Sequence, residues 1–141
     1  MMTETLNCIL LIDDDAPTIY LNKLAIKQAD CVKHIEEKYS GPDALKYLKT
    51  KDKGAYPKPE IIFLDVNMPG MDGWQFLEEY IKLEENQKAN YIYIMLTTAL
   101  KPPIREKVEK FNVIKGYLYK PLNNHDFNEI LKENFQHKYG G

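Results

Sequence analysis

The sequence lacks the features of membrane, secreted and disulfide-stabilised proteins. Among its 141 residues there are only 2 cysteines. Cys8 and Cys31 have no CxxC partner, so we expect two reduced thiols near strands rather than a disulfide or a metal site. No apolar run approaches transmembrane length, and residues 1–5 lack the basic region of a signal peptide. We therefore expect a cytoplasmic protein with no membrane insertion.

An excess of charge of one sign is also lacking. The chain has 19 Lys and Arg against 21 Asp and Glu, a net charge of −2, which gives no reason to expect direct nucleic-acid binding. The three histidines (His34, His125 and His137) have no ligand spacing and are expected at the surface. No GxxxxGK[ST] motif occurs, which excludes a P-loop nucleotide hydrolase. Length and composition predict one soluble domain over residues 1–141, with its core at about 7–137 and no output domain.

The most informative stretch is residues 61–73, where four large apolar residues lead directly into Asp65. A run this short and apolar, bounded by turn residues, predicts a strand buried on both faces of a parallel sheet. Its carboxylate then lies at the carboxyl end of the strand, where open α/β sheets place their chemistry. Asp72 precedes Gln75 by three residues, the spacing of a capping box that opens the next helix.

Strands and helices are predicted to alternate along the rest of the chain. We expect strands at 7–12, 32–38, 60–65, 91–97 and 115–119, and helices at 17–29, 73–86, 102–111 and 124–137. A further helix is expected to open at Ser40-Gly41-Pro42 and to end before a polar linker at 51–59. The strand at 32–38 is half polar, as expected for a sheet edge.

Each predicted helix has an apolar stripe that indicates its inward face. The first presents Leu21, Leu24 and Ala25; the second Ala44, Leu45 and Leu48; the third Phe76, Leu77, Tyr80 and Ile81; the fourth Ile104, Val108 and Phe111; the last Phe127, Ile130, Leu131 and Phe135. The stripe of the fourth helix is the thinnest. We expect this helix to be held by the least burial.

This pattern predicts an α/β fold: a (βα)5 doubly wound, parallel five-stranded sheet of flavodoxin-like order 2-1-3-4-5. Polar residues follow four of the strands: Asp13 and Asp14, Asp65, Thr97 and Thr98, and Lys120. In a doubly wound sheet these ends converge on one crevice. Clustered carboxylates repel one another, and Mg²⁺, which takes carboxylate and phosphate oxygens, would relieve that repulsion.

The segment Asp65, Met68-Pro69, Met71-Asp72-Gly73 resembles the phospho-acceptor segment of bacterial two-component response-regulator receiver domains. The resemblance extends over the whole chain and is closest to stand-alone, chemotaxis-regulator-like receivers. It implies a phosphorelay protein that accepts a phosphoryl group on Asp65 from a histidine kinase or a histidine phosphotransfer protein. The family is not enzymatic beyond self-phosphorylation and autodephosphorylation.

The resemblance also implies a role for each site residue. Asp14 would bind Mg²⁺ directly, Asp13 through water, Asp65 as acceptor and ligand, and Asn67 through its backbone carbonyl. Thr97 would be the switch hydroxyl, Lys120 with Pro121 would match the Lys-Pro pair of the family, and Tyr117 would be the aromatic switch residue. Two departures stand out: Asp15 adds a third acid, and Thr98 follows Thr97 where the family usually has Ala or Ser. Thr98 is therefore a second candidate for the switch hydroxyl.

Three other readings compete with this one. A haloacid-dehalogenase-like aspartyl-phosphate phosphatase needs a second Asp two residues after its nucleophile, where this chain has Asn67. A flavodoxin needs a Ser/Thr/Gly-rich phosphate loop in place of Asp13-Asp14-Asp15. A degenerate receiver would serve as an interaction module without phosphorylation.

The expected output is a protein-binding surface. Residues 101–120 hold five basic residues besides Lys120, namely Lys101, Arg105, Lys107, Lys110 and Lys115, against Glu106 and Glu109. We expect them to line the face made by helix four, strand five and helix five, and to meet an acidic patch on a target protein. The protein itself is expected to be a monomer or a weak dimer.

Overall fold

The computed structural model describes residues 5–135, in which strands and helices alternate. The strands are β1 (Leu6–Ile12), β2 (Val32–Lys38), β3 (Ile61–Asp65), β4 (Tyr91–Leu96) and β5 (Ile114–Tyr119). The helices are α1 (Ala16–Gln28), α2 (Gly41–Leu48), α3 (Gly73–Tyr80), α4 (Pro102–Lys110) and α5 (Asn124–Asn134), with a short 3₁₀ turn η1 (Glu85–Gln87) before β4.

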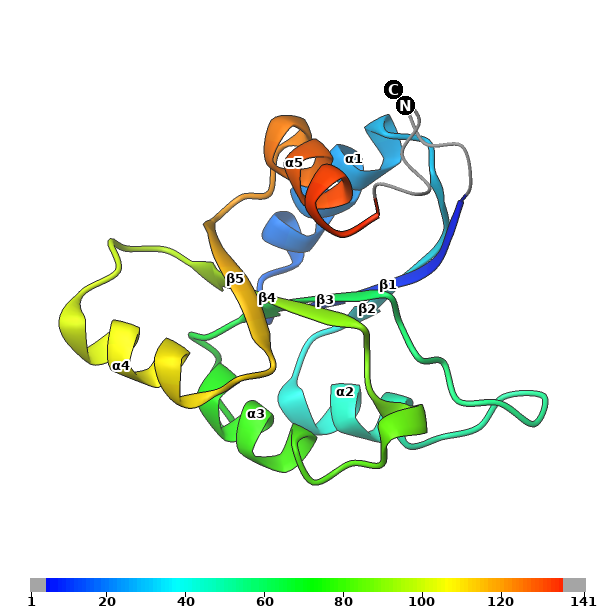
Figure 1. Ribbon diagram of the computed structural model, residues 1–141, viewed down its shortest axis with the longest axis horizontal. Coiled ribbons are helices and arrows are strands. Elements are labelled where there is room, and N and C mark those ends of the chain that lie inside the picture. Colours follow the sequence, from blue (N-terminus) through cyan, green and yellow to red (C-terminus); the bar gives the residue numbers. More distant parts are fainter. Residues whose placement is uncertain (1–4, 136–141) are drawn as a thin grey trace.

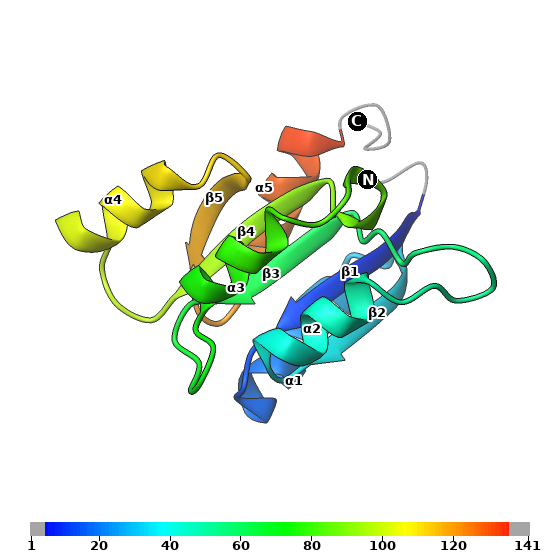
Figure 2. The same ribbon diagram turned by 90° about the horizontal axis from the view of Figure 1, so that it is seen from below.

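The strands form one parallel sheet in the order β2-β1-β3-β4-β5, which confirms the predicted topology. Helices α1 and α5 cover one face of this sheet, and α2, α3 and α4 lie on the other (Figure 1). Figure 2 shows α2 and α3 side by side across the second face. The half-polar β2 is an edge strand, as its sequence predicted, and β3 is central and wholly buried.

Side-chain caps fix where the helices begin. The Asp72 carboxylate accepts a hydrogen bond from the Gln75 backbone N–H, and Gln75 Oε1 accepts one from the Asp72 N–H, which confirms the predicted capping box. Ser40 caps α2 in the same sense, through its hydroxyl and the Asp43 N–H. These caps set the ends of the loops that surround the carboxyl edge of the sheet.

Two hydrophobic clusters, one on each face of the sheet, hold the layers together. On the α1/α5 face, Phe63 of β3 lies against Phe127 of α5 and Tyr93 of β4. On the other face, Leu10 and Leu64 pack with residues of α2 and α3. The predicted inward residues of α2 and α5 are buried as expected.

The predicted inward stripe of α1 is wrong for Leu21 and Leu24 and confirmed for Ala25. Leu21 is 47% exposed and Leu24 40% exposed, while the buried residues of the helix are Ile19, Asn22, Ala25 and Ile26. Asn22 can be buried because its Oδ1 accepts a hydrogen bond of 2.8 Å from the Leu122 backbone N–H, just beyond β5. The helix therefore turns Leu21 and Leu24 to solvent.

The predicted end of the third helix is also wrong. Instead of residue 86, α3 stops at Tyr80, and Ile81 is exposed. The Tyr80 hydroxyl accepts a hydrogen bond from the Ala89 N–H, and the Lys88 ammonium donates to the Ile81 carbonyl, so the chain folds back across the helix end. The last helix ends at Asn134, and its predicted residues 136–137 lie outside the described part of the chain.

Helix α4 differs from the others because none of its residues is buried. Ile104 and Val108 are partly buried against the α2/α3 side, and Phe111 at its end is buried. Figure 1 shows α4 set apart from the rest of its layer, at the far left.

Both cysteines are free and buried. Burial raises the pKa of the Cys8 thiol, and it raises that of Cys31 to about 11. In residues 5–135, no helix has the length and apolarity needed to cross a membrane.

Candidate functional site

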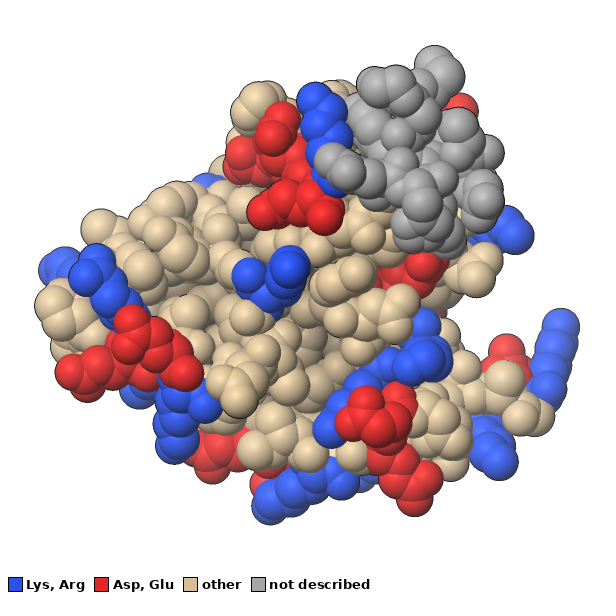
Figure 3. Space-filling model, in the orientation of Figure 1, with Lys and Arg blue, Asp and Glu red and all other residues tan. Residues whose placement is uncertain are grey.

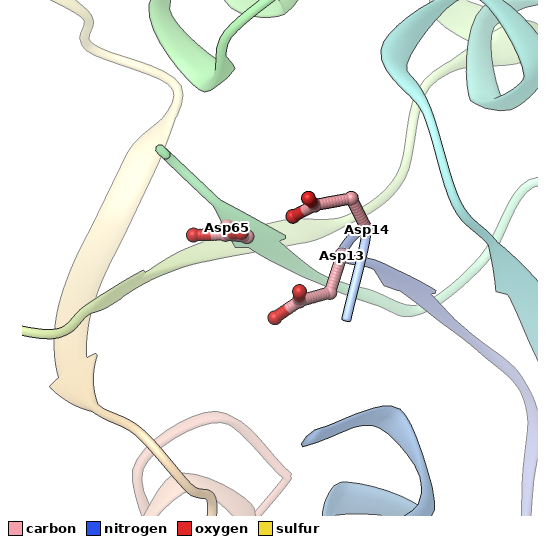
Figure 4. Close-up of side chains that lie close together, drawn as sticks. All are labelled: Asp13, Asp14 and Asp65. Carbon is pink, nitrogen blue, oxygen red and sulfur yellow. The ribbon is translucent and has the colours of Figure 1, made fainter. Parts of the chain in front are cut away.

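The site lies at the carboxyl edge of the sheet, where β1 and β3 end side by side. Ile12 pairs with Leu64, so Asp13 and Asp65, the next residues, lie at neighbouring strand ends. Both side chains are buried, whereas that of Asp14 is exposed. Figure 4 shows the side chains of Asp13, Asp14 and Asp65 close together at the ends of β1 and β3. The predicted acidic cluster is therefore present in the fold.

Lys120 supplies the positive charge between two of these carboxylates. Its ammonium lies 2.9 Å from Asp13 Oδ2 and 3.1 Å from Asp65 Oδ1. The Lys120 backbone N–H donates to the Leu96 carbonyl, which anchors the end of β5 to β4, and a cis peptide bond joins Lys120 to Pro121. The sequence placed Lys120 beside Asp65, but its equally close contact with Asp13 was not predicted.

The two oxygens of Asp65 have different environments. Oδ1 accepts a hydrogen bond of 3.0 Å from the Asn67 backbone N–H and contacts Lys120. Oδ2 is buried and has no hydrogen-bond partner among the described residues. A buried carboxylate oxygen without a partner is costly unless a cation or another polar group meets it. Asp65 Oδ2 is therefore the carboxylate oxygen that is available to a bound cation or another polar group.

The donor set fits a hard divalent cation. One carboxylate oxygen from each of Asp13, Asp14 and Asp65 lies within 4.8 Å of the other two. Asp13 Oδ1 already accepts the Asp15 N–H at 2.9 Å and its Oδ2 contacts Lys120, while Asp14 is open to solvent. Mg²⁺ is bound in proteins by one or two carboxylates with water completing the shell. Asp14 and the free oxygen of Asp65 are the available ligands.

Burial raises the pKa of Asp65 to about 6, and the nearby charge of Asp13 adds to this, against the Asn67 N–H and Lys120, which lower it. For Lys120, burial lowers the pKa, but the hydrogen bonds to Asp13 and Asp65 outweigh it and the net shift is upward. Lys120 therefore stays charged at neutral pH, and Asp65 is largely ionised.

Asp15 has a structural position rather than a place in the cluster. Its carboxylate caps α1 by accepting hydrogen bonds from the Thr18 backbone N–H and hydroxyl, which lower its pKa. The third acid of the run is thus explained by the start of the helix. The N-cap pattern, an Asp before Pro17 at the first turn, was the available signal for this assignment.

A hydrogen bond links Asn67, two residues after Asp65, to Thr97, which follows β4. The Asn67 side-chain amide donates to the Thr97 hydroxyl at 3.3 Å, and Thr97 is exposed. This contact was not predicted, because sequence reasoning considered only the backbone of Asn67. Thr98 is exposed too, so the geometry does not remove it as a candidate.

Tyr117 lies apart from the cluster on β5. It is 42% exposed, and its ring packs edge-to-face against Tyr119 with centroids 6.0 Å apart. The structure therefore brings together Asp13, Asp14, Asp65 and Lys120, links Asn67 to Thr97, and leaves Tyr117 at the surface.

The surface around α4, β5 and α5 carries two signs of charge. Of the expected bases, Arg105, Lys107 and Lys110 are on α4, Lys101 directly precedes it and Lys115 is on β5. A pocket beside β5 is also lined by three acids of α5, Asp126, Glu129 and Glu133. Figure 3 shows Asp and Glu side chains gathered at the top, where Figure 1 has α5. Acidic side chains of α5 therefore adjoin the bases of α4 and β5 on this surface.

Comparison with known proteins gives one consistent family. The sequence model described as "Response regulator receiver domain" matches residues 9–132. The chain is 28% identical over 125 residues to the probable methanogenesis regulatory protein FilR2 of Methanothrix harundinacea, covering 89% of this chain and 79% of that protein. It is 26% identical to the hybrid signal transduction histidine kinase L of Dictyostelium discoideum, over 98% of this chain but only 8% of the kinase.

Solved structures show the same fold. A two-component response regulator from Cytophaga hutchinsonii has a TM-score of 0.75 at 24% identity, covering 92% of this chain and 97% of that one. Vibrio cholerae chemotaxis protein CheY4 has a TM-score of 0.70 at 23% identity, with coverage of 92% and 98%. These likenesses confirm the doubly wound architecture.

Proposed function

The chain belongs to the response regulator receiver domain family of two-component signalling, and we propose that it accepts a phosphoryl group on Asp65. The observation that carries this proposal is the buried, unpartnered Oδ2 of Asp65 beside the carboxylates of Asp13 and Asp14. An acceptor needs one oxygen that the protein does not occupy. A dehalogenase-type phosphatase would lack its general acid here, because residue 67 is an asparagine, and its side-chain amide donates to Thr97.

The donor would be the phosphohistidine of a histidine kinase or of a phosphotransfer protein. An Asp65 carboxylate oxygen attacks phosphorus, the P–N bond to the imidazole breaks, and the imidazole nitrogen leaves with the bonding electron pair and takes up a proton. The product is a mixed anhydride of the Asp65 carboxylate and the phosphoryl group. Because Asp65 is largely ionised at neutral pH, its carboxylate is ready to attack.

Mg²⁺ bound at this edge would offset the negative charge of the phosphoryl oxygens. We propose Asp14 and Asp65 as direct ligands, Asp13 through water, and the backbone carbonyl of Asn67. Asp13 suits the indirect role because Asp15 and Lys120 already engage its oxygens.

Lys120 and Thr97 would hold the phosphoryl group after transfer. The Lys120 ammonium already lies 3.1 Å from Asp65 Oδ1 and can move to a phosphoryl oxygen. The Thr97 hydroxyl, with Thr98 as the second candidate, would leave the Asn67 amide and donate to the same group. The space vacated beside β4 would admit Tyr117, which shifts a pre-existing equilibrium between two conformations.

The exposed face of α1 supports docking of the phosphoryl donor. Tyr20, Leu21 and Leu24 are exposed together on the helix that begins just after Asp14 and Asp15. Clustered apolar side chains at a surface mark interaction sites. A donor protein seated there would approach Asp65 over the β1–α1 loop.

The target protein would bind the face formed by α4, β5 and α5. We propose that an acidic patch of the target meets the bases of α4 and β5, so affinity should fall with added salt. Because α5 carries acids beside β5, the acidic patch of the target should contact α4 and β5 and not extend over α5, where like charges would repel.

Intact mass after incubation with acetyl phosphate and Mg²⁺ tests the acceptor. The parent should gain one phosphoryl group and Asp65→Asn should gain none. Asp15→Asn is the matched control, because Asp15 is a nearby acid whose capping role Asn retains, and it should be labelled like the parent. Equal labelling of Asp65→Asn and the parent would refute the assignment, and absence of labelling in the parent would favour the degenerate receiver.

The metal is tested separately by titrating Mg²⁺ or Mn²⁺ while following amide chemical shifts. Asp14→Ala should weaken binding at least about 10-fold, because it removes the exposed ligand. Asp15→Ala should bind like the parent. Unchanged affinity in Asp14→Ala would place the ion elsewhere.

A further inference from the structure

Helix α4 needs something other than burial to hold it against the domain. None of its residues from Pro102 to Lys110 is buried, and only Ile104 and Val108 are partly covered. A helix with so little buried apolar surface opens locally at low free-energy cost. The contacts made by its second half and its end therefore decide where it rests.

Two of these contacts involve one side chain of α3, Trp74, the single tryptophan of the sequence. The rings of Trp74 and Phe111 are stacked, with centroids 6.3 Å apart and an interplanar angle of 19°. The Lys107 ammonium lies over the Trp74 ring, 5.6 Å from its centroid. We call Trp74, Lys107 and Phe111 the Trp74 cluster. Aromatic stacking and a cation–π contact both favour the arrangement in which the end of α4 lies against α3.

Trp74 is also fixed to the acceptor strand through Gly73. A Cβ at position 73 would lie 2.6 Å from Val66 Cα and 2.8 Å from the Asp65 carbonyl oxygen, so the start of α3 packs directly on the backbone of the acceptor. The Gly73 N–H donates to the Val66 carbonyl at 3.1 Å. The capping box of Asp72 and Gln75 holds the same turn.

We propose that Trp74 is a positioning residue that anchors α4 to the start of α3, which itself packs on the backbone of Asp65 and Val66. The anchoring stands on the contacts of the Trp74 cluster alone. Its regulatory consequence, that a change at Asp65 reaches α4 through Gly73 and Trp74, rests on the proposed function. Two residues would then influence the position of α4 in the partner-binding surface: Thr97, which follows β4, and Trp74 of α3.

Hydrogen–deuterium exchange of the metal-free protein tests the anchor. Trp74→Leu should raise amide exchange across residues 104–110 of α4 about 10-fold, while α2 and α5 keep parent protection. Trp74→Phe, which retains a stacking ring, should restore most of the protection, and Lys107→Ala should raise exchange by a smaller factor. Tyr20→Leu, an exposed aromatic change on α1, is the matched control and should leave α4 unaffected.

Two outcomes would overturn the anchor. Exchange in residues 104–110 could stay unchanged in Trp74→Leu, in which case Ile104 and Val108 suffice to hold the helix. Exchange could also rise equally in α2, α3 and α4, in which case Trp74 is an ordinary packing residue. If Trp74→Leu does not fold, Lys107→Ala decides the question. Faster α4 exchange in that variant supports the anchor, and unaltered α4 exchange overturns it.

Tryptophan fluorescence tests the coupling to the site. Beryllofluoride with Mg²⁺, used as a phosphoryl mimic, should change acrylamide quenching of Trp74 at least about twofold in the parent and leave it unchanged in Asp65→Asn. A mimic that binds, as seen by amide shifts at Asp14 and Asp65, without altering Trp74 quenching would refute the coupling. Failure of the mimic to bind would count against the proposed function, whereas the exchange result above would still judge the anchor.

Discussion

The two helices that flank β5 are packed in opposite ways. Helix α5 buries Phe127, Ile130 and Leu131 against the sheet, while α4 buries none of its residues. Of the two helices next to β5 in the chain, α5 is therefore part of the hydrophobic core and α4 is not. Moving α5 would expose its buried side chains to water, at a high cost in free energy. Moving α4 exposes little, so α4 is the helix that can shift at low free-energy cost.

The largest effect is expected on the α5 side. Phe127→Ala should lower the free energy of unfolding by about 3–5 kcal/mol, because it removes a fully buried ring that packs on Phe63. Urea denaturation measures this. A loss below about 1 kcal/mol would mean that α5 is held no more firmly than α4.

The next effect concerns the link between α1 and the chain entering α5. Asn22→Ala should destabilise by about 1–3 kcal/mol, since the buried Leu122 N–H loses its acceptor. The loss should appear in thermal unfolding, with Leu21→Ala as the control. Leu21 is an exposed residue one position away, and its change should cost less than about 0.5 kcal/mol. Equal losses for the two variants would contradict the buried hydrogen bond.

The ionised carboxylate of Asp65 should lower the free energy of unfolding at neutral pH. This effect depends on pH, whereas the packing of α4 and α5 does not, so a pH series separates the two contributions. The folded pKa of Asp65 is raised to about 6, so its protonated form stabilises the fold. That contribution is present below the unfolded pKa of about 4 and is lost as pH rises through 6. In EDTA, Asp65→Asn should therefore exceed the parent by up to about 2 kcal/mol at pH 7–8 and match it near pH 4.

Mg²⁺ provides the control for this pH experiment. A bound cation restores the balance of charge, so the gap between Asp65→Asn and the parent should narrow when Mg²⁺ replaces EDTA. A gap that is constant from pH 4 to 8 would show that something other than the Asp65 charge separates the two proteins.

The smallest effect is expected in α4. Val108→Ala should cost less than about 1 kcal/mol, because the side chain is only partly buried. Its global unfolding should match the parent closely, although α4 itself should exchange faster. A loss comparable to that of Phe127→Ala would remove the contrast between the two helices.

The sequence was sufficient where local signals and the fold agree. The apolar strand before Asp65, the capping box at Asp72 and the alternation of elements each predicted what the structure shows. The joint occurrence of polar residues at four strand ends placed Asp13, Asp14, Asp65 and Lys120 together, because parallel strands deliver their carboxyl ends to one edge.

The errors came from contacts between residues far apart in the chain. The face of α1 depends on a hydrogen bond between Asn22 and Leu122, and an Asn at helical spacing gives no reason to prefer its burial over that of Leu21 or Leu24. The end of α3 depends on Tyr80 meeting Ala89 across a turn that contains neither Gly nor Pro. Local propensity cannot supply either contact.

The burial of both native thiols has a practical consequence. Cys8 and Cys31 are covered, and burial raises the pKa of each, so little thiolate forms at neutral pH. A cysteine introduced at an exposed position of α4, such as Glu109→Cys, would then be the one residue to react quickly with a maleimide dye. Spectroscopic probes of helix position can be attached to this protein without first replacing its own cysteines.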